Sequence, residues 1–405
     1  MNRRLFLATA AAGFQGLAQP QATDLPESIR KLKPMLDGIQ PITDDERRAR
    51  VEKARRLMRE NKLGAVVMEP GSSMFYFSGT RGASANALVL PATGEPVWIA
   101  PEAGTAQMRG DVRAWSGAAG PFARIVEALK DRGAGAGRVG LEERVAFATF
   151  DGLRNAAPAL EFVSANPVTV GCRVIKSAAE IALMHRANDI TIAAYKAALA
   201  ALREGMTPRE LSGNIAAAYH ALGVQGNAMA IFGQYTAFPH GSIQPQQLRE
   251  GDMVLIDDGC TVEGYQSDIT RTTVFGKPTD RQRQVWNVER KAQDAALAAA
   301  RPGAACESVD AAARKVITDA GFGPGYKTPG LPHRTGHGIG LDGHEWTYLV
   351  KGNKTRLEPG MCFSDEPTIA IYGEFGIRLE DCMYITAEGA RMFTRQSPAI
   401  DQPFG

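Results

Sequence analysis

The chain has 405 residues, with 46 Lys and Arg against 44 Asp and Glu, and a formal net charge of +2. This length is enough for two domains with sizeable cores, and the near-neutral charge gives no argument for nucleic acid or an anionic surface as a partner. No internal stretch is long and apolar enough to span a bilayer. The five cysteines form no CxxC motif, which predicts buried free thiols rather than a disulfide framework.

The N-terminus has the anatomy of an export signal. Arg3 and Arg4 precede Leu-Phe-Leu and a mildly apolar, Ala-rich run to Leu17, and residues 16–18 supply small side chains at the usual cleavage positions. The paired arginines and the weak hydrophobicity favour the twin-arginine route, with a general-secretory signal or a tail with two chance arginines as alternatives. We therefore expect residues 1–22 to be a signal peptide and the mature protein to be periplasmic or extracellular.

The next part of the chain predicts a small α/β domain. Residues 23–42 are polar and interrupted by proline, which predicts a linker with a short helix. Beyond it, hydrophobic periodicity predicts helices over 44–61, 122–132 and 147–157 and strands over 64–68, 87–90 and 96–100. This alternation indicates an α/β domain over residues 43–172.

The second half, residues 173–405, predicts antiparallel strands with helices outside them. Capping boxes open helices at Ser177, at Thr207 and at Thr279, and a further helix begins at Ser308 and runs to about Ala320. We expect the first of these helices to end near Glu204. Strands are predicted over 253–257, 264–275, 361–371 and 376–386. The chain as a whole is therefore predicted to be α+β.

Side chains from these strands, together with a histidine in a glycine-flanked segment between two of them, form a candidate metal site. Four carboxylates around one imidazole suit two hard divalent cations, because each carboxylate can bridge or chelate. Two such cations can hold a shared water and lower its pKa towards neutrality, which is the chemistry of a hydrolase. Without a cation, acidic groups on one face of a curved sheet would repel one another. The five residues are Asp257, Asp268, His337, Glu366 and Glu380.

Strand geometry supports this grouping. A hairpin with its turn at 259–264 would carry Asp257 on one arm and Asp268 on the other. Alternation along 376–386 places Arg378, Glu380 and Cys382 on one face and an apolar set on the opposite face: Ile377, Leu379 and Met383.

Taken singly, each candidate has a more ordinary interpretation. A lone strand-end aspartate is more often a turn residue, and a lone histidine is more often a satisfied core or surface group. Spacing alone does not choose between each proposed acid and its neighbour, which is Asp258, Asp365 or Asp381. Four of the six histidines fall in or beside these segments, namely His240, His333, His337 and His344, whereas His185 and His220 lie on predicted helices and are interpreted as structural.

In combination, the segments resemble the pita-bread metallopeptidase family, which includes methionine aminopeptidase, aminopeptidase P and prolidase. The resemblance covers about 177–400 and is carried by the motifs Asp257-Asp-Gly259, Ser267-Asp-Ile-Thr-Arg-Thr272, Thr335-Gly-His-Gly-Ile-Gly340 and Arg378-Leu-Glu-Asp381. The segment Ser73–Arg81 resembles the N-terminal domain of the prolidase, aminopeptidase P and creatinase branch. The implied fold is a creatinase/prolidase-like α/β domain followed by a pita-bread domain, a curved antiparallel sheet covered by helices.

The resemblance also implies a role for each site residue. It selects Asp257, Glu366 and Glu380 over their acidic neighbours. Asp257 would chelate one metal, Asp268 and Glu380 would bridge both, and His337 with Glu366 would complete the second. Arg378 would support the bridging glutamate. His240, His333 and His344 would face the substrate.

The implied activity is hydrolysis of X-Pro peptide bonds through a metal-bridging hydroxide. Glu366 would carry a proton to the leaving nitrogen, and His240 or His344 would stabilise the oxyanion. A carboxylate-rich site suits Mn²⁺ best, with Co²⁺, Fe²⁺ or Zn²⁺ as alternatives.

The substrate is expected to be a proline-containing di- or oligopeptide, and the protein a homodimer or larger homo-oligomer. Dipeptidase and aminopeptidase activity both stay open at this point. After Glu345 the chain reads Trp346-Thr-Tyr348, where many relatives carry a proline nearby, which leaves the fine specificity open. Two rival interpretations are a non-catalytic pita-bread module that binds peptides or proteins and a creatinase-like C–N hydrolase without metal. The complete set of five candidate ligands argues against both.

Overall fold

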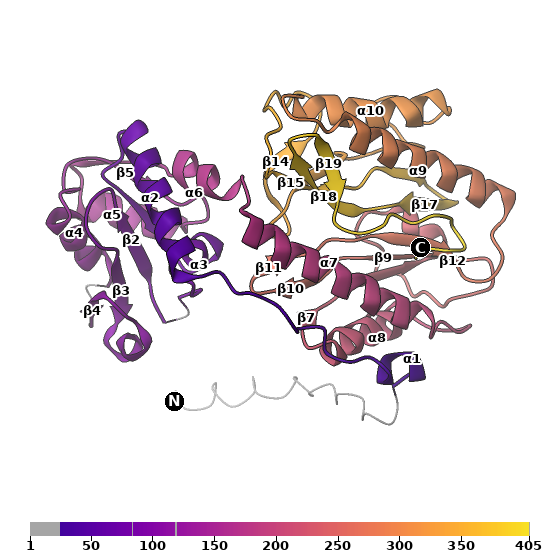
Figure 1. The fold of residues 1–405 in the computed structure, drawn as a ribbon, viewed down its shortest axis with the longest axis horizontal. Coiled ribbons are helices and arrows are strands. Elements are labelled where there is room, and N and C mark those ends of the chain that lie inside the picture. The colour runs from indigo at the N-terminus through magenta and orange to yellow at the C-terminus, as the bar shows by residue number, and fades with distance from the viewer. Residues whose placement is uncertain (1–24, 83, 118–119, 405) are drawn as a thin grey trace, which may run out of the picture.

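The computed structural model describes residues 25–82, 84–117 and 120–404, and the predicted signal at 1–22 lies outside them. Figure 1 shows a smaller body that runs from α2 to α6 and a larger body built from α7 onward. None of the described helices has an apolar run long enough to cross a membrane.

The smaller body is a six-stranded mixed sheet in the order β4-β3-β2-β1-β5-β6, with helices on both faces. In β1, Ala65 and Val67 face the core beneath α4 and α5, whereas Val66 and Met68 face the core beneath α2 and α6. The three predicted strands and three predicted helices are confirmed. The elements are α2(Asp44–Glu60), β1(Ala65–Met68), α3(Ser72–Ser78), β2(Ala87–Pro91), β3(Val97–Pro101), η1(Glu102–Gln107), β4(Asp111–Trp115), α4(Phe122–Asp131), β5(Gly137–Leu141), α5(Phe147–Ala156), β6(Leu160–Ser164) and α6(Asn166–Arg173).

The segment predicted as a linker carries the short helix α1(Glu27–Arg30) and packs against the larger body. Ile29 is fully buried, and Ser28 Oγ donates a hydrogen bond to the carbonyl oxygen of Ala197 at 2.7 Å. The segment therefore runs along the larger body before it enters α2.

Four helices cover the larger body. The capping boxes at Ser177, Thr207 and Thr279 are all present in the structure. The first helix ends at Leu199, five residues before the predicted end, and the last begins at Cys306, two residues before Ser308. The bounds are α7(Ala178–Leu199), α8(Pro208–Ala221), α9(Asp280–Ala299) and α10(Cys306–Asp319).

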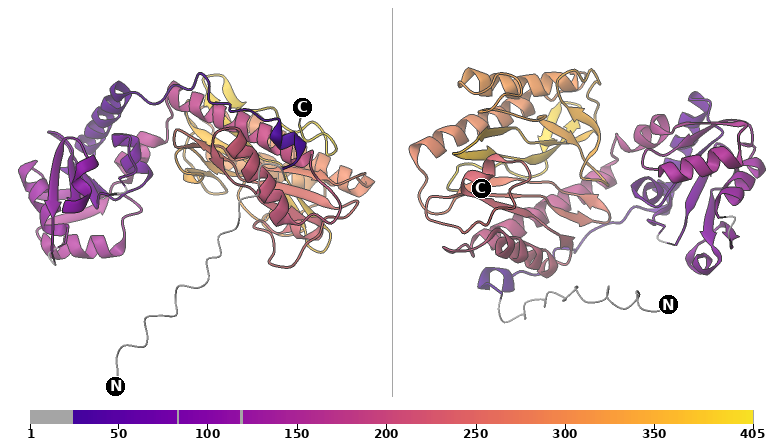
Figure 2. Two further views of the ribbon diagram at one scale, coloured as in Figure 1. Left: turned by 90° about the horizontal axis from the view of Figure 1, so that it is seen from below. Right: turned by 180° about the vertical axis from the view of Figure 1, so that it is seen from behind.

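The strands of the larger body lie between α7 with α8 on one side and α9 with α10 on the other (Figures 1 and 2). All pairings among its named strands are antiparallel. The ladders are β11-β10-β7, β12-β9-β8, β14-β13-β15-β18-β19 and β16-β17. The bounds are β7(Gln225–Gly226), β8(Met229–Phe232), η2(Gly233–Ala237), β9(Met253–Asp257), β10(Cys260–Val262), β11(Tyr265–Gln266), β12(Arg271–Val274), β13(Gly336–Gly338), β14(Glu345–Leu349), β15(Cys362–Asp365), β16(Thr368–Ile371), β17(Phe375–Arg378), β18(Asp381–Thr386) and β19(Gly389–Met392).

Three strands that the sequence predicted as continuous are interrupted in the structure. The strand over 361–371 breaks at Pro367, which has no N–H to donate to a ladder. The strand over 264–275 breaks at 267–270. The strand over 376–386 breaks at Leu379 and Glu380, where the Glu380 N–H donates to the carbonyl oxygen of Thr270 at 3.2 Å. The predicted turn at 259–264 is also shorter, because β10 and β11 pair on either side of Glu263 and Gly264.

The two faces predicted for 376–386 are nevertheless confirmed. Ile377, Leu379 and Met383 lie together in the core beneath α9 and α10. Cys382 lies on the opposite side, where its thiol donates to the carbonyl oxygen of Asp268 at 3.1 Å. All five cysteines are free and buried, as the sequence predicted.

The two bodies are joined by a buried ionic network around Glu345, the first residue of β14. The Glu345 carboxylate pairs with Arg173 at the end of α6 and, at 2.9 Å, with Lys176 before α7, and it accepts the Leu341 N–H at 2.9 Å. Burial alone raises the pKa of Glu345, but Lys176 and Arg173 outweigh it and lower the pKa to about 2. The residue next to Glu345 is His344, so this network fixes the chain at the edge of the site described below.

Candidate metal centre

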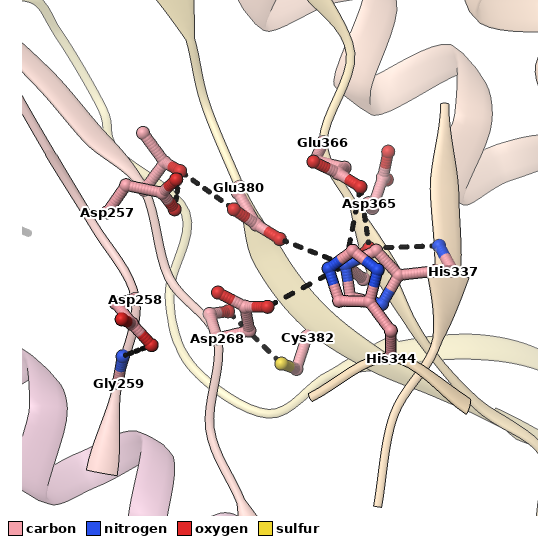
Figure 3. Close-up of polar contacts among 12 residues, drawn as sticks. Asp257, Asp258, Gly259, Asp268, His337, His344, Asp365, Glu366, Glu380 and Cys382 are labelled. Carbon is pink, nitrogen blue, oxygen red and sulfur yellow. Dashed lines mark hydrogen bonds and ion pairs between the residues drawn. The ribbon is translucent and has the colours of Figure 1, made fainter. Parts of the chain in front are cut away.

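The four candidate carboxylate ligands all lie where a strand ends or is interrupted. Asp257 ends β9, Asp268 lies between β11 and β12, Glu366 between β15 and β16, and Glu380 between β17 and β18. Figure 3 shows their side chains turned towards one another from these different segments. Such breaks re-aim side chains that a regular strand would send to alternate faces.

The imidazole of His337 lies among these acids. Its Nε2 atom lies 3.3 Å from Glu366 Oε1, 3.6 Å from Asp268 Oδ2 and 4.0 Å from Glu380 Oε1. Its Nδ1 atom lies 3.0 Å from the carbonyl oxygen of Gly338 and therefore donates to it, which leaves Nε2 unprotonated towards the carboxylates. Burial is the main cause that lowers the pKa of His337 to about 3, so the ring is neutral at working pH.

These side chains form overlapping groups that fit more than one cation. His337, Glu366 and Glu380 offer ligand atoms within 4.8 Å of one another, and so do Asp257, Asp268 and Glu380. Glu380 belongs to both groups, as a bridging ligand would. A third group joins Asp268 and His337 to His344.

The donor set fits hard divalent cations on its own electrostatics. Glu380 Oε1 is buried and has no hydrogen-bond partner among the described residues. Burial, followed by repulsion from neighbouring acids, raises the pKa of Glu380 and of Asp268 well above the ordinary range. Burial also raises the pKa of Glu366 to about 7. A buried, unpartnered carboxylate is costly, and a bound cation removes that cost.

Asp257 differs from the other acids because the guanidinium of Arg378 pairs with its carboxylate. Burial raises its pKa, but Arg378 and Thr270 outweigh this and leave the pKa lowered. Arg378 pairs with Asp257, and no contact from Arg378 to the Glu380 carboxylate is present among the described residues. The contact to Glu380 comes instead from Thr270, whose Oγ1 lies 2.7 Å from Glu380 Oε2 and 2.5 Å from Asp257 Oδ1. Arg378 thus pairs with Asp257 and reaches Glu380 through Thr270, because its Nε donates to Thr270 Oγ1 at 3.1 Å; its expected support of the bridging glutamate stays a prediction.

The acidic neighbours of the candidate ligands point elsewhere. Asp258 is exposed and accepts a hydrogen bond from the Gly259 N–H at 3.0 Å. Asp381 pairs with Arg271 at 2.7 Å. Asp365 is fully buried outside the groups described above, and neither of its carboxylate oxygens has a partner among the described residues.

The three histidines expected to face the substrate take different positions. The His344 ring stacks on His337, with centroids 3.7 Å apart and an interplanar angle of 19°. Both ring nitrogens of His333 are engaged, one with the Arg334 carbonyl at 2.7 Å and one with Thr368 Oγ1 at 3.0 Å. His240 belongs to none of the three groups and lines a neighbouring cavity of about 550 Å³.

Comparison with known proteins identifies the family. Residues 182–387, more than half of the chain, match the metallopeptidase family M24, and residues 50–175 match the creatinase/prolidase N-terminal domain. The chain belongs to metallopeptidase family M24. This confirms the resemblance drawn from the motifs, together with the predicted fold of an α/β domain followed by a pita-bread domain. The roles of the individual residues stay predictions.

The M24 chain is similar to dipeptidases over most of its length. It is 33% identical over 308 residues to an Xaa-Pro dipeptidase of Lactobacillus delbrueckii subsp. lactis, and the matched region covers 74% of this chain and 82% of that protein. The structure of dipeptidase PepE from Mycobacterium ulcerans covers 88% of this chain and 97% of its own, with 31% identity and a TM-score of 0.80. A prolidase structure from Pyrococcus furiosus covers 84% of this chain and 99% of its own, with 28% identity and a TM-score of 0.73.

Sequence reasoning missed two polar residues of this M24 site. Thr270 links Asp257 to Glu380, and Arg334 contacts His344. Thr270 lies inside a quoted motif, two residues after Asp268, and Arg334 directly precedes another, three residues before His337. Their place in or beside the motifs was the available signal, but their contacts join different segments of the chain, which the sequence does not bring together.

Metal affinity is expected to rise with pH. A cation competes with protons at Glu366, whose pKa is about 7, and at Glu380 and Asp268, whose pKa values burial and neighbouring acids raise well above the ordinary range. Releasing one proton per ion predicts about a tenfold gain in apparent Mn²⁺ affinity per pH unit below about pH 7. Calorimetric titration in buffers of different ionisation enthalpy measures both the affinity and the protons released. Affinity that does not change between about pH 6 and 7 would contradict these raised pKa values.

Proposed function

We propose that this protein is a metallo-exopeptidase that hydrolyses X-Pro bonds of short peptides at the site formed by Asp257, Asp268, His337, Glu366 and Glu380. The observation that carries the proposal is the convergence of Asp268, Glu366 and Glu380 on the unprotonated Nε2 of His337, with Asp257 grouped beside Asp268 and Glu380. Similarity to an Xaa-Pro dipeptidase and to a prolidase supports the choice of bond. The complete ligand set disfavours a non-catalytic module and a metal-free C–N hydrolase.

These five residues would hold two divalent cations, most suitably Mn²⁺, since carboxylate oxygens dominate the set. When bound, such cations lower the pKa of a shared water and polarise a carbonyl oxygen. The protein supplies the remaining functions. Glu366, whose Oε1 lies 3.3 Å from His337 Nε2 and whose pKa is raised to about 7, can carry a proton to the leaving nitrogen. The leaving nitrogen of any peptide bond needs such a proton, because it departs as an amine; in an X-Pro bond it departs as the secondary amine of proline. The X-Pro bond also offers no N–H for recognition.

The proposal is tested by turnover of Ala-Pro, Ala-Pro-Ala and Ala-Ala, with Mn²⁺ and with a chelator. Chelator-sensitive release of alanine from Ala-Pro, with little from Ala-Ala, is the expected result. Turnover of Ala-Ala at the same rate would remove the X-Pro assignment, and turnover that resists exhaustive chelation would remove the metal mechanism. The ratio of the Ala-Pro rate to the Ala-Pro-Ala rate decides between dipeptidase and aminopeptidase activity.

The proposal extends to export and assembly. The paired arginines Arg3 and Arg4 support the twin-arginine route, and replacing both with lysine is expected to retain the precursor in the cytoplasm. Unchanged export would point to the general route. Exposed aromatic side chains of the larger body, Phe238, Trp346 and Tyr372, support burial against a second copy of the chain. Sedimentation velocity is expected to give a dimer or larger species.

A further inference from the structure

Arg334, just before β13, is a cation whose only side-chain hydrogen bond in the described part of the chain goes to a histidine. One of its terminal nitrogens, Nη2, lies 2.8 Å from His344 Nδ1. Its guanidinium carbon lies 5.0 Å from the centroid of the Tyr348 ring, at cation–π distance. Its Nε atom is buried with no hydrogen-bond partner. Among the described residues, Arg334 forms no ion pair with a carboxylate.

This contact fixes where the proton of His344 lies. A guanidinium has donors only and keeps its proton at any working pH, so it must donate in this hydrogen bond. His344 Nδ1 is then the acceptor and carries no proton. A neutral imidazole has one N–H, which must be on Nε2. Stacking on His337 at 3.7 Å holds the plane of the ring (Figure 3).

The position of this proton decides between two roles of His344, metal ligand and hydrogen-bond donor, that the interatomic distances alone leave open. His344 lies close enough to Asp268 and His337 to be a metal ligand. An imidazole binds a metal only through an unprotonated nitrogen, and the Nδ1 lone pair of His344 is already used by Arg334. The protonated Nε2 can donate to an oxygen but cannot bind a cation. The exposed His344 residue therefore suits stabilisation of negative charge on a substrate oxygen.

We infer that Arg334 is a positioning residue that keeps His344 in the Nε2–H form, as a hydrogen-bond donor to the reacting carbonyl oxygen and not as a sixth metal ligand. The part of this inference that concerns turnover rests on the proposed function. The part that concerns the proton on His344 does not, and it can be measured without a substrate.

The proton is located by NMR of protein labelled with ¹⁵N in histidine, at about pH 8, where an ordinary histidine is neutral. The chain has only six histidines, and His344→Asn assigns the resonance. In the wild-type protein we expect Nε2–H on His344, both before and after addition of Zn²⁺. In Arg334→Met, Nδ1 is free to take the proton, and Zn²⁺ is expected to convert His344 to the Nδ1–H form as Nε2 binds the ion. Arg334→Lys, which can still donate to Nδ1, should keep the wild-type form.

A proton on Nδ1 of His344 in the wild-type protein would overturn the inference. So would an Arg334→Met protein whose His344 spectrum is identical to that of the wild type with and without Zn²⁺. Because neither outcome involves a peptide, the inference can fail while the proposed X-Pro activity stands. Conversely, absence of X-Pro turnover would refute the proposed function and leave the NMR result intact.

Kinetics test whether Arg334 acts through His344. Loss of one positioned oxyanion donor costs about 10²- to 10³-fold in kcat. We expect Arg334→Met to lower kcat by about 10- to 100-fold at nearly constant KM, with partial recovery in Arg334→Lys. The double variant Arg334→Met with His344→Asn should be no slower than His344→Asn alone.

Additive losses in the double variant would overturn the positioning role. Comparison of Ala-Pro with Ala-Pro amide separates the main rival, in which Arg334 binds the terminal carboxylate of the peptide. The positioning role requires equal losses on both substrates. A loss confined to the free acid would assign Arg334 to carboxylate recognition instead.

Discussion

Replacing Asp268 with Asn is expected to abolish metal-dependent turnover and, at the same time, to stabilise the metal-free protein. Asp268 shares a ligand group with Asp257 and Glu380 and also lies 3.6 Å from Nε2 of His337, so its loss is expected to affect both cation positions. Metal ions contribute several kcal/mol to such hydrolyses, so kcat should fall by at least about 10³-fold. In the metal-free protein, burial and repulsion from Asp257 and Glu366 raise the pKa of Asp268, and asparagine removes that repulsion.

The sign of the stability effect follows from the raised pKa. A carboxylate whose folded-state pKa is raised destabilises the fold at pH values above its unfolded-state pKa. Asp268→Asn should therefore raise the unfolding temperature of the metal-free protein at about pH 8 and have little effect at about pH 4. Metal content and thermal unfolding with and without Mn²⁺ measure both effects.

Asp258→Asn is the matched control, because Asp258 lies ten residues before Asp268 and outside the ligand groups. It should keep full metal content and most of the activity. Retained metal and turnover in Asp268→Asn, or their loss in Asp258→Asn, would mean that the ligand set is misassigned.

Replacing Arg271 with Met is expected to lower the free energy of unfolding strongly, because it breaks a fully buried ion pair. Arg271 and Asp381 each have side chains 1% exposed and lie 2.7 Å apart. Arg271 also donates to the carbonyl oxygens of Glu380, Thr270 and Arg395. Removing one partner leaves an uncompensated buried charge, which costs about 3–5 kcal/mol. Because Arg271 holds the backbone of Glu380, metal affinity should fall as well.

Urea unfolding of the metal-free protein measures this loss. The double variant Arg271→Met with Asp381→Asn removes both charges and should recover part of the stability. Arg283→Met is the surface control, because its pair with Asp401 has both side chains 43% exposed, and it should leave the unfolding midpoint unchanged. Equal effects of the buried and surface substitutions would show that the Arg271 pair does not stabilise the larger body.

The strand breaks explain how a regular-looking sequence builds this site. Each acid lies where pairing stops, so its side chain is directed by local backbone contacts and not by the pleat. Pro367 ends one ladder, and the Glu380 N–H bonds to Thr270 instead of to a strand partner. These interruptions concentrate negative charge that is unfavourable without metal. The metal-free protein is therefore less stable than it would be without this cluster of acids, and the destabilised residues are the candidate metal ligands.

Several features of the fold and of the site could be predicted from the sequence. The three capping boxes, the free cysteines and the two faces of residues 376–386 follow from local chemistry and periodicity, and the structure confirms them. The motifs were sufficient to identify the family before any geometry was known. The interruptions at 267–270 and 379–380 were not predicted, because no proline or glycine marks them.

The sequence by itself determined which residue types were present for metal chemistry and in which segments they lie, because ligand chemistry is a property of single side chains. The family resemblance of the motifs already selected Asp257 over Asp258, and the structure agrees. Only the tertiary structure decided that Arg378 pairs with Asp257 and that Arg334 holds the ring of His344. The physical reason is that each of these contacts joins atoms from different segments of the chain. Their direction depends on where hydrogen-bonded pairing stops, and pairing is a property of two segments together.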